Sequence, residues 1–424
     1  MATTVIVGTG IIGLSTAYYL SKHQPGTTIH LIDSSPDLFT SASGYAGGFL
    51  ARTWHEHDPR VAALAALSFD EHSKLAEEEG GHDKWEYSKA ESLIYTRTKD
   101  NTVEGDENWM AEGKSRAGLV KERQREPDEG KIPQWLKRVD GDAVGLIDDE
   151  GTAIVDPLKL CQFLLEKLIS EGVQIHHPAI ILSIGTDVRD ELSYVRIGYT
   201  DSSTETEIPA TRLLLSAGAW TPIVFKSLFK DSTFDIPISS LAGHSLVVKK
   251  PEDAKSTNYL IFSSFPDGPS LEFGTRPSGV VYFTGVNSAL IPLPPLVAER
   301  KIIPESIEQL KGLAKEVLTL NEGQELEVVR TGLCFRPVTD KGTPYISRLA
   351  DEQLGGGIRT RPGADGGVFV AAGHGPWGIS MSLGTGLVMA ELMGGKNTSV
   401  DITGLGLQQE TYLPYGGDVL SFKG

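Results

Sequence analysis

The sequence predicts an α/β protein, α+β overall, built from two sheets of different kinds. Residues 3–33 read as strand, glycine-rich loop, helix and second strand, which is the order of a parallel βαβ unit. Residues 236–286 instead carry short β-rich runs separated by turn residues, which is typical of an antiparallel sheet. At 424 residues the chain is long enough for two domains. We therefore expect a parallel-sheet domain with a second, largely antiparallel domain inserted into it.

The N-terminal βαβ unit carries a glycine motif typical of dinucleotide binding. Its first strand leads into Gly8, Gly10 and Gly13, and its second strand ends on Asp33. The first glycine permits a tight turn, the second lets the backbone approach a pyrophosphate, and the third lets helix and strand pack closely. The helix start favours phosphate, and the acid can accept hydrogen bonds from ribose hydroxyls. Because the first strand, the helix, the second strand and the acid at its end follow one another with the expected spacing, we expect an adenine dinucleotide site rather than a plain βαβ turn.

Composition restricts the partners of this chain. Lys and Arg total 39 against 56 Asp and Glu, a net charge of −17 without a basic cluster, so we expect no binding to nucleic acid. Cys161 and Cys334 cannot supply a disulfide framework, and the absence of a CxxC motif or a His/Cys cluster predicts no structural metal. The chain enters a strand almost at once and has no apolar run of membrane-spanning length. A cytoplasmic protein with small-molecule partners is expected.

Three further segments of small residues are candidates for ligand contact. The run 41–51 offers little for a core, so we expect its backbone to lie against something flat or anionic rather than to form a flexible loop. The buried strand 213–215 ends in the segment 216–220, where ligands lie in open α/β sheets. The strand 368–372 runs into the glycine-rich loop 373–380 at a helix start. Loops of this kind at both ends of the chain predict one long ligand between them.

The intervening elements follow from hydrophobic periodicity and turn residues. Asp156 and Pro157 are typical of a helix start. A charged stretch at 98–141 reads as a surface insertion, part helix and part loop. The expected helices are 59–79, 158–170 and 304–320, and the expected strands are 85–87, 92–95, 173–175, 180–182, 245–248, 259–262, 271–273, 280–283 and 325–335, with a hairpin over 194–208.

Together these motifs resemble the FAD-dependent oxidoreductase family that contains D-amino-acid oxidase, glycine oxidase, sarcosine oxidase and the fungal amadoriases. The likeness covers both ends and the middle of the chain. It is greatest to uncharacterised fungal and plant members resembling the yeast protein Tda-three, through the AGGFLA run and the CxRPVT stretch. The resemblance implies a Rossmann-type FAD-binding domain from residues 1–55, 142–225 and 325–424, a substrate domain from 56–97 and 226–324, and the insertion 98–141.

The resemblance also implies FAD as the cofactor and assigns contacts to it. They fall on the pyrophosphate loop, the ribose acid, the segment beside the flavin, an adenine contact, a strand end and the C-terminal loop. In that order they are Gly8, Gly10, Ile11, Ile12 and Gly13; Asp33 and Ser34; Ser43, Gly44, Ala46, Gly47, Gly48, Phe49 and Leu50; Ile181; Ser216, Ala217, Gly218 and Trp220; and Gly375, Pro376, Trp377, Gly378 and Ile379.

In this family the flavin takes a hydride from the carbon beside a nitrogen of an amino acid or a related primary or secondary amine. The resemblance therefore implies C–N oxidation to an imine, with hydrogen peroxide as a second product if oxygen is the acceptor. Two alternatives stay open. An NAD(P)-dependent dehydrogenase would share only the opening motif and would lack flavin absorbance, and a non-catalytic flavin-binding interaction protein would not be bleached by any substrate.

Three residues are candidates for the reaction through the same resemblance. Arg336 matches the arginine that binds the substrate carboxylate in glycine oxidase, with an ordinary strand-end ion pair as the alternative. Cys334 has the spacing of the cysteine linked to the flavin in sarcosine oxidase, with inert packing as the alternative. Glu272 falls where sarcosine oxidase has an oxygen-activating lysine, and because a carboxylate cannot supply that charge, the expectation of an oxidase is weakened.

Several other polar residues invite a catalytic role without a motif that supports it. Arg52 and His55 follow the flavin-side segment closely, and His57, His244 and His374 lie near other motifs. For each of them we expect a surface role or a hydrogen-bonded core position.

Overall fold

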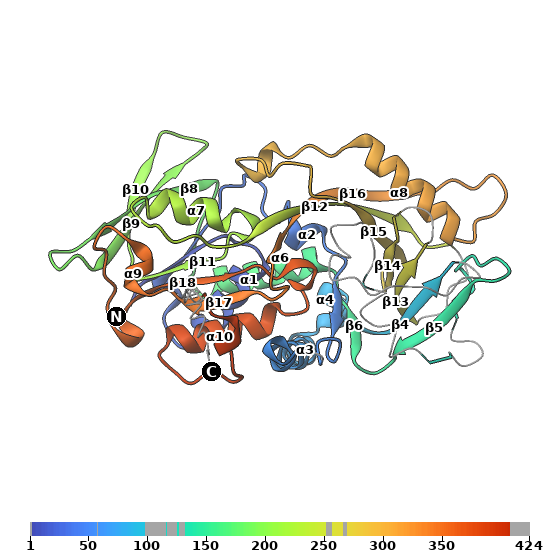
Figure 1. The fold of residues 1–424 in the computed structure, drawn as a ribbon, viewed down its shortest axis with the longest axis horizontal. Helices are drawn as coiled ribbons and strands as arrows, with labels where there is room; N and C mark the ends of the chain where they lie inside the picture. The colour runs from blue at the N-terminus through green and yellow to red at the C-terminus, as the bar shows by residue number, and fades with distance from the viewer. Residues whose placement is uncertain are drawn as a thin grey trace, which may run out of the picture.

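The structure is a computed structural model that describes residues 2–56, 58–97, 116, 125–126, 132–251, 257–265 and 269–407. In this part of the chain, strands form a six-stranded, a nine-stranded and a three-stranded sheet. The first and third lie in one half of the molecule and the nine-stranded sheet lies in the other (Figure 1). Two sheets of different kinds were predicted, and both are present.

The six-stranded sheet is the parallel sheet that the glycine motif predicts. Every neighbouring pair is parallel except the edge pair β17–β18. Its strands in spatial order are β17 (Tyr345–Arg348), β18 (Gly367–Ala372), β11 (Arg212–Leu215), β1 (Thr4–Val7), β2 (Ile29–Ile32) and β7 (Gln174–His176). Because β1, β11 and β18 are parallel neighbours, their carboxyl ends meet at one edge. Loops from both ends and the middle of the chain are thereby brought together.

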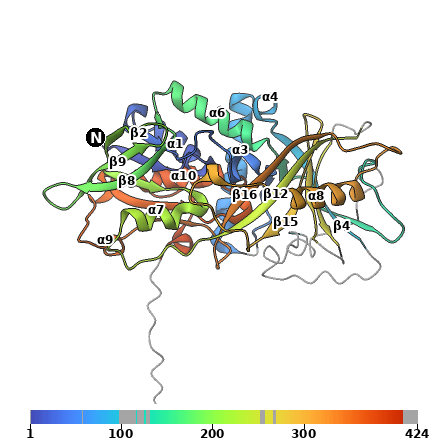
Figure 2. The ribbon, with the colours of Figure 1, turned by 90° about the horizontal axis from the view of Figure 1, so that it is seen from above.

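Side chains of this sheet alternate between two apolar layers. Val5 and Val7 belong to one buried cluster, whereas Ile6 belongs to another, as the two-residue period of a strand requires. Helices α1 (Ile11–Ser21), α6 (Pro157–Ser170) and α10 (Ser382–Met393) contribute to the cluster of Ile6, and α7 (Thr221–Leu228) contributes to that of Val5. Figure 2 shows α6 and α7 on opposite sides of the strands. A helix-covered parallel sheet results.

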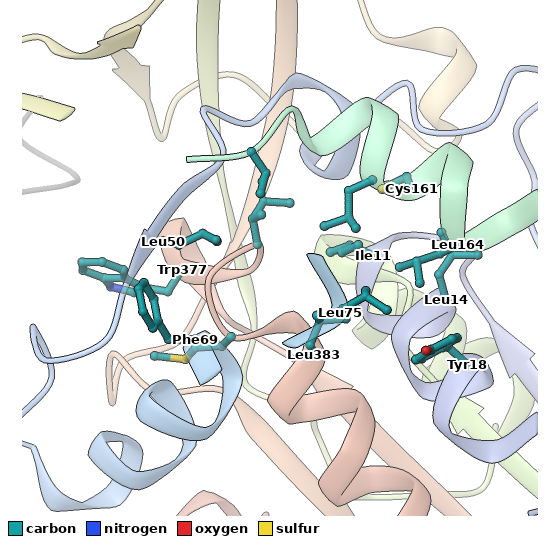
Figure 3. Packing of buried hydrophobic residues seen from close by; sticks show 14 of the residues in the cluster. Ile11, Leu14, Tyr18, Leu50, Phe69, Leu75, Cys161, Leu164, Trp377 and Leu383 are labelled. Atoms are coloured by element: carbon teal, nitrogen blue, oxygen red, sulfur yellow. The ribbon is translucent and has the colours of Figure 1, made fainter. Parts of the chain in front are cut away.

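The apolar layer beneath the loop that follows β1 joins helices that are distant in sequence. Figure 3 shows Leu14 of α1, Leu164 of α6 and Leu383 of α10 gathered in one cluster. Asp156 fixes the start of α6 by accepting hydrogen bonds from the amides of Leu158 and Lys159, at 2.9 and 3.2 Å. The predicted cap and apolar face of this helix are confirmed.

The nine-stranded sheet is antiparallel apart from one pair, β4–β13. Helix α8 (Pro304–Val317) shares a buried cluster with it. The strands in order are β16 (Val328–Val338), β12 (Ser239–Lys249), β15 (Val280–Ser288), β14 (Glu272–Arg276), β13 (Asn258–Ser264), β4 (Ser88–Thr96), β6 (Thr152–Ile154) and β3 (Phe49–Ala51), with β5 (Ala143–Asp148) paired to β4. A largely antiparallel second sheet was predicted and is confirmed.

The remaining elements are short or complete the two halves. They are the strands β8 (Ala179–Thr186), β9 (Leu192–Tyr199) and β10 (Glu205–Pro209) of the three-stranded sheet, and the helices α2 (Ala42–Tyr45), α3 (Pro59–Glu79), α4 (Gly81–Trp85) and α9 (Asp351–Leu354).

One predicted strand is wrong. Residues 85–87 were expected to be extended, but Trp85 ends α4 and Glu86 takes the left-handed conformation with φ 59°. The indole of Trp85 is fully buried and stacks near Phe163 with ring centroids 4.5 Å apart. Tertiary packing of this ring therefore overrides its β propensity, and the strand begins at Ser88.

Candidate functional site

A cavity of about 450 Å³ lies between the carboxyl edge of the six-stranded sheet and the nine-stranded sheet. One wall is formed by the loops that follow β1, β11 and β18, together with the segment before β3. The other wall is formed by side chains of β14, β15 and β16. We refer to these as the loop wall and the sheet wall.

The loop after β1 and the first turn of α1 each require a glycine. Gly8 has φ 104°, and a Cβ there would lie 2.6 Å from the carbonyl oxygen of Ser216. A Cβ at Gly13 would overlap the carbonyl oxygen of Gly8. The amide of Ile11, at the start of α1, donates to Oγ of Ser43 at 2.9 Å. The strand, the helix start and the segment at residue 43 are therefore held at close approach, as a site for pyrophosphate requires.

Asp33 lies beside this loop at the end of β2. One carboxylate oxygen accepts from the amide of Thr9 and the other from the amide of Ser35, both at 2.9 Å. Asp33 and Ser34 both line the cavity. The acid is thus fixed at the position where ribose hydroxyls meet a dinucleotide fold.

The segment before β3 presents backbone to the cavity. A Cβ at Gly47 would lie 2.9 Å from Cε1 of Phe49 and 3.0 Å from Cε1 of Tyr282. The buried Arg276 of β14 donates to the carbonyls of Ala46 and Gly47, each at 3.2 Å. Its Nη1 also forms an ion pair with the carboxylate of Asp156 at 2.9 Å. The sheet of the second half therefore holds this small-residue segment in place.

Most of the residues expected to contact the cofactor line the cavity, but four lie behind its wall. Leu50 is fully buried in the core, and Trp377 is buried beneath the C-terminal loop. Gly13 and Gly44 allow close packing, because a Cβ at either would overlap a backbone carbonyl oxygen. The residues that do line it are Gly8, Gly10, Ile11, Ile12, Asp33, Ser34, Ser43, Ala46, Gly47, Gly48, Phe49, Ile181, Ser216, Ala217, Gly218, Trp220, Cys334, Gly375, Pro376, Gly378 and Ile379.

Arg336 reaches the cavity from β16. Its Nη1 donates to Oδ1 of Asn287 at 2.7 Å and its Nη2 donates to Oγ1 of Thr284 at 3.1 Å. Both partners are neutral, and among the described residues no carboxylate lies within ion-pair distance of this guanidinium. A Cβ at Gly243 of the neighbouring strand β12 would overlap Nη1. Glycine at this position therefore makes the space in which an uncompensated positive charge faces the cavity.

Cys334 lies on the same face of β16 as Arg336, two residues earlier, and also lines the cavity. Its thiol is buried and donates to the carbonyl of Gly243 at 3.5 Å. Burial raises the pKa of Cys334, an effect larger than the opposing influence of Arg336. The thiol is therefore accessible from the cavity but is held in its neutral form.

Glu272 of β14 has a partner that the sequence does not indicate. Its carboxylate accepts from Nε and Nη2 of Arg116, and both residues line the cavity. Arg116 belongs to the charged stretch 98–141, which was expected to be a surface insertion, yet its side chain is only 6% exposed. No periodicity or motif singles out this arginine among its charged neighbours.

Among the other polar residues that invited a catalytic role, one lines the cavity. Burial lowers the pKa of His374 to about 3, and its Nε2 lies 3.0 Å from Oγ1 of Thr385. Arg52 is bound by Asp70 on the surface, with side chains 45% and 56% exposed. His55 packs against Trp377, His244 bonds the amide of Ile303 at 3.2 Å, and His57 lies outside the described residues.

The described part of the chain contains no group of three His, Cys, Asp or Glu side chains arranged to hold a metal ion. Among the helices in the same part, none combines the length and the apolar character that crossing a membrane requires.

Comparisons with known proteins support the cofactor that this geometry fits. A model of the family described as FAD dependent oxidoreductase matches residues 3–392. Two fungal proteins named as oxidoreductases are similar over nearly their whole length. C1F5.03c of Schizosaccharomyces pombe is 27% identical over 94% of this chain and 96% of that protein. TDA3 of Saccharomyces cerevisiae is 24% identical over 95% of this chain and 93% of its own.

Solved structures agree on the fold. Glycine oxidase from Geobacillus kaustophilus superposes with a TM-score of 0.68 at 18% identity, covering 96% of this chain and 98% of that one. L-proline dehydrogenase from P. horikoshii gives a TM-score of 0.70 at 16% identity over 96% of each chain. The family match sets aside an NAD(P)-dependent enzyme and a non-catalytic protein, and it confirms FAD as the cofactor. The chain belongs to the FAD-dependent oxidoreductase family of enzymes.

Proposed function

We propose that this enzyme oxidises the C–N bond of an amino acid or a related primary or secondary amine that carries a carboxylate. The observation that carries the proposal is the guanidinium of Arg336, which faces the cavity with only neutral hydrogen-bond partners. A partly buried cation that has no carboxylate partner among the described residues favours an anionic ligand, and a guanidinium fork suits a carboxylate because both hydrogen bonds form at once.

FAD would lie along the loop wall. We assign its pyrophosphate to the loop from Gly8 to Ile12 at the start of α1, and its ribose to Asp33. The flavin would lie against the backbone from Ala46 to Phe49, with its pyrimidine edge toward the loop from Gly375 to Ile379. Gly8 and Gly47 both line the cavity. A Cβ at either would crowd the protein behind the wall, at the backbone of Ser216 and at the rings of Phe49 and Tyr282, so the wall can keep this shape only with glycine there, which supports the placement.

The cofactor supplies the acceptor for the hydride that leaves the substrate carbon. The protein side chains would orient the substrate. Arg336 would bind the substrate carboxylate, while Thr284 and Asn287 fix the plane of its guanidinium through bonds at 3.1 and 2.7 Å. The product of this oxidation is an imine, which hydrolyses in water. Hydrogen peroxide follows if oxygen reoxidises the cofactor.

Structural neighbours support an amino-acid substrate as a class. They include glycine oxidase, iminodiacetate oxidase and L-proline dehydrogenase, whose names specify amino acids or an amino dicarboxylate. Each of these is below 20% identical to this chain, so the likeness supports the fold, and the substrate rests on Arg336.

Anaerobic mixing of the yellow holoenzyme with a panel of amino acids and N-methyl amines tests the proposal. Bleaching of the flavin absorbance by a carboxylate-bearing amine is expected, and Arg336→Ala should lower the bimolecular rate about 100-fold, because the substrate carboxylate loses its charge-assisted hydrogen bonds. Arg52→Ala serves as the matched control, because that arginine lies on the surface. If Arg336→Ala reduced the flavin as fast as the parent with the same substrate, the assignment would fail.

The state of Cys334 and the electron acceptor follow from simple measurements. A covalent thioether between Cys334 and the flavin leaves yellow colour in an acid precipitate, whereas colour in the supernatant rules the bond out.

Glu272 and Arg116 together bring no net charge to the position of the oxygen-activating lysine of sarcosine oxidase. We therefore expect slow reoxidation of the reduced enzyme by air, over many minutes, and rapid reoxidation would identify an oxidase.

A further inference from the structure

We propose that Arg116 and Glu272 form a neutral ion pair that restricts the cavity to amino acids with an uncharged side chain. Arg116 would thus be a specificity-determining residue supplied by the stretch 98–141. This inference rests on the proposed function, because it takes Arg336 as the group that binds the substrate carboxylate.

The pair satisfies both of its charges within the sheet wall. Nε of Arg116 donates to Oε1 of Glu272 at 3.0 Å and Nη2 donates to Oε2 at 2.7 Å. Oε1 also accepts from the backbone amide of Arg116 at 2.8 Å, and Oε2 also accepts from Nε at 3.1 Å. The two side chains are 6% and 9% exposed. These contacts occupy both oxygens of the carboxylate, and the opposite charge of Glu272 beside the guanidinium lowers its attraction for a second anion.

Aromatic rings enclose the guanidinium and separate it from water. The Cζ atom of Arg116 lies 4.6 Å from the ring centre of Trp377, 5.2 Å from that of Phe262 and 5.6 Å from that of Phe49. Such contacts favour a desolvated cation over ring faces. The surroundings therefore hold Arg116 in place and exclude the water that would otherwise solvate a charged ligand.

The charges of the sheet wall then decide which ligands fit. Among the described residues Arg336 has no carboxylate partner, and the charges of Arg116 and Glu272 cancel, so one substrate carboxylate is matched. A second carboxylate on a substrate would lose its hydration and would meet Arg116, the other arginine among the described lining residues, already paired with Glu272. A cationic side chain would likewise find Glu272 occupied by Arg116. Burying an unpaired charge is unfavourable, so amino acids with neutral side chains are favoured.

Each half of the pair can be removed to expose the other. In Arg116→Met the carboxylate of Glu272 loses its partner and should bind cations, and in Glu272→Gln the guanidinium of Arg116 should bind a second anion. The double variant Arg116→Met/Glu272→Gln removes both charges and is the matched control for packing. The probes are butyrate, butylamine and glutarate, titrated into each oxidised holoenzyme while the flavin spectrum is recorded, with isothermal calorimetry as a second readout.

The proposal predicts that each single variant gains affinity for a ligand charge of opposite sign. Butylamine should bind at least about 10-fold more tightly to Arg116→Met than to the parent, and glutarate should gain at least about 10-fold relative to butyrate in Glu272→Gln. In the double variant both gains should vanish. An unchanged affinity for butylamine in a folded Arg116→Met protein, or an unchanged glutarate-to-butyrate ratio in a folded Glu272→Gln protein, overturns the assignment.

Two further results bear on the assignment: whether each variant folds, and whether butyrate binds to the parent enzyme. If only one single variant folds, its titration decides. If neither folds, the pair is a structural element alone and the assignment is overturned. Butyrate that fails to bind the parent, or that binds equally well to Arg336→Ala, counts against the proposed function. The butylamine titration still judges the pair in that case, because it does not involve Arg336.

Discussion

The two walls of the cavity are built in different ways. The loop wall presents backbone and small side chains, and its shape depends on the absence of a Cβ at positions such as Gly8 and Gly13. The sheet wall presents long charged side chains from neighbouring strands, held by hydrogen bonds between 2.7 and 3.1 Å. Steric exclusion governs the first wall and charge compensation governs the second. Substitutions should therefore act as an on–off change in the loop wall and as a graded change in the sheet wall.

The largest effect is expected from Gly13→Ala. The added Cβ would overlap the carbonyl oxygen of Gly8, which is backbone and cannot turn away. We expect loss of more than about 100-fold in FAD affinity, measured by fluorescence titration of the apoprotein. Gly312→Ala is the matched control, because it adds a methyl group in α8 with nothing within 4 Å. Unchanged flavin content in Gly13→Ala would contradict the steric account of the loop wall.

A graded effect is expected from Gly243→Ala in the sheet wall. Its Cβ would displace the guanidinium of Arg336, which ends a flexible side chain and can move. Butyrate affinity should fall about 10- to 100-fold, while the flavin content stays that of the parent. Loss of flavin along with the ligand would mean that the two walls are not independent.

Acid should weaken the loop wall through a buried histidine. Burial lowers the pKa of His72 to about 4, and its ring bonds the carbonyl of Ile379 in the C-terminal loop at 2.9 Å. In the unfolded chain the pKa of histidine is about 6.5. Between these values the unfolded state binds more protons than the folded state, so the free energy of unfolding falls as pH falls below about 6.5.

The expected loss from His72 is about 2 kcal/mol between pH 7 and pH 5. His72→Gln should flatten this dependence, since an amide can still donate to the carbonyl of Ile379 without titrating. Urea unfolding of both holoenzymes at the two pH values measures it. Parallel curves for parent and variant would show that His72 does not contribute.

The smallest effect is expected outside both walls. Arg52 and Asp70 form an exposed pair at 2.9 Å, and such pairs contribute about 0–1 kcal/mol to stability. Arg52→Ala should leave flavin content and butyrate affinity unchanged and should lower the melting temperature by at most a few degrees. A change in ligand affinity above about threefold would place this arginine in the site.

The difference between the two walls also explains which parts of the site could be predicted from the sequence. The loop wall is encoded by local patterns, because Gly8, Gly13 and Asp33 fall within one βαβ unit and each has a steric or capping role there. The cap at Asp156 is equally local. Residues 85–87 were misassigned because the packing of Trp85 is decided by Phe163, far along the chain.

The sheet wall depends on contacts that local patterns do not contain. Arg116 meets Glu272 across 156 residues, and no local feature marks it among the charges around it. Gly243 pairs with Cys334 across β12 and β16, which sets it diagonally opposite Arg336. Arg336 itself was reached through a family resemblance, and its role stays a prediction, as do the domain boundaries.

The order of strands in the six-stranded sheet has a consequence for biosynthesis. β11 lies between β1 and β18, so the edge at which we propose that the cofactor binds joins the first strand of the parallel sheet along the chain to the last one. A ribosome must release residues beyond 372 before this edge exists. We therefore expect a nascent chain to take up the cofactor only after β18 and the loop that follows it have left the ribosome.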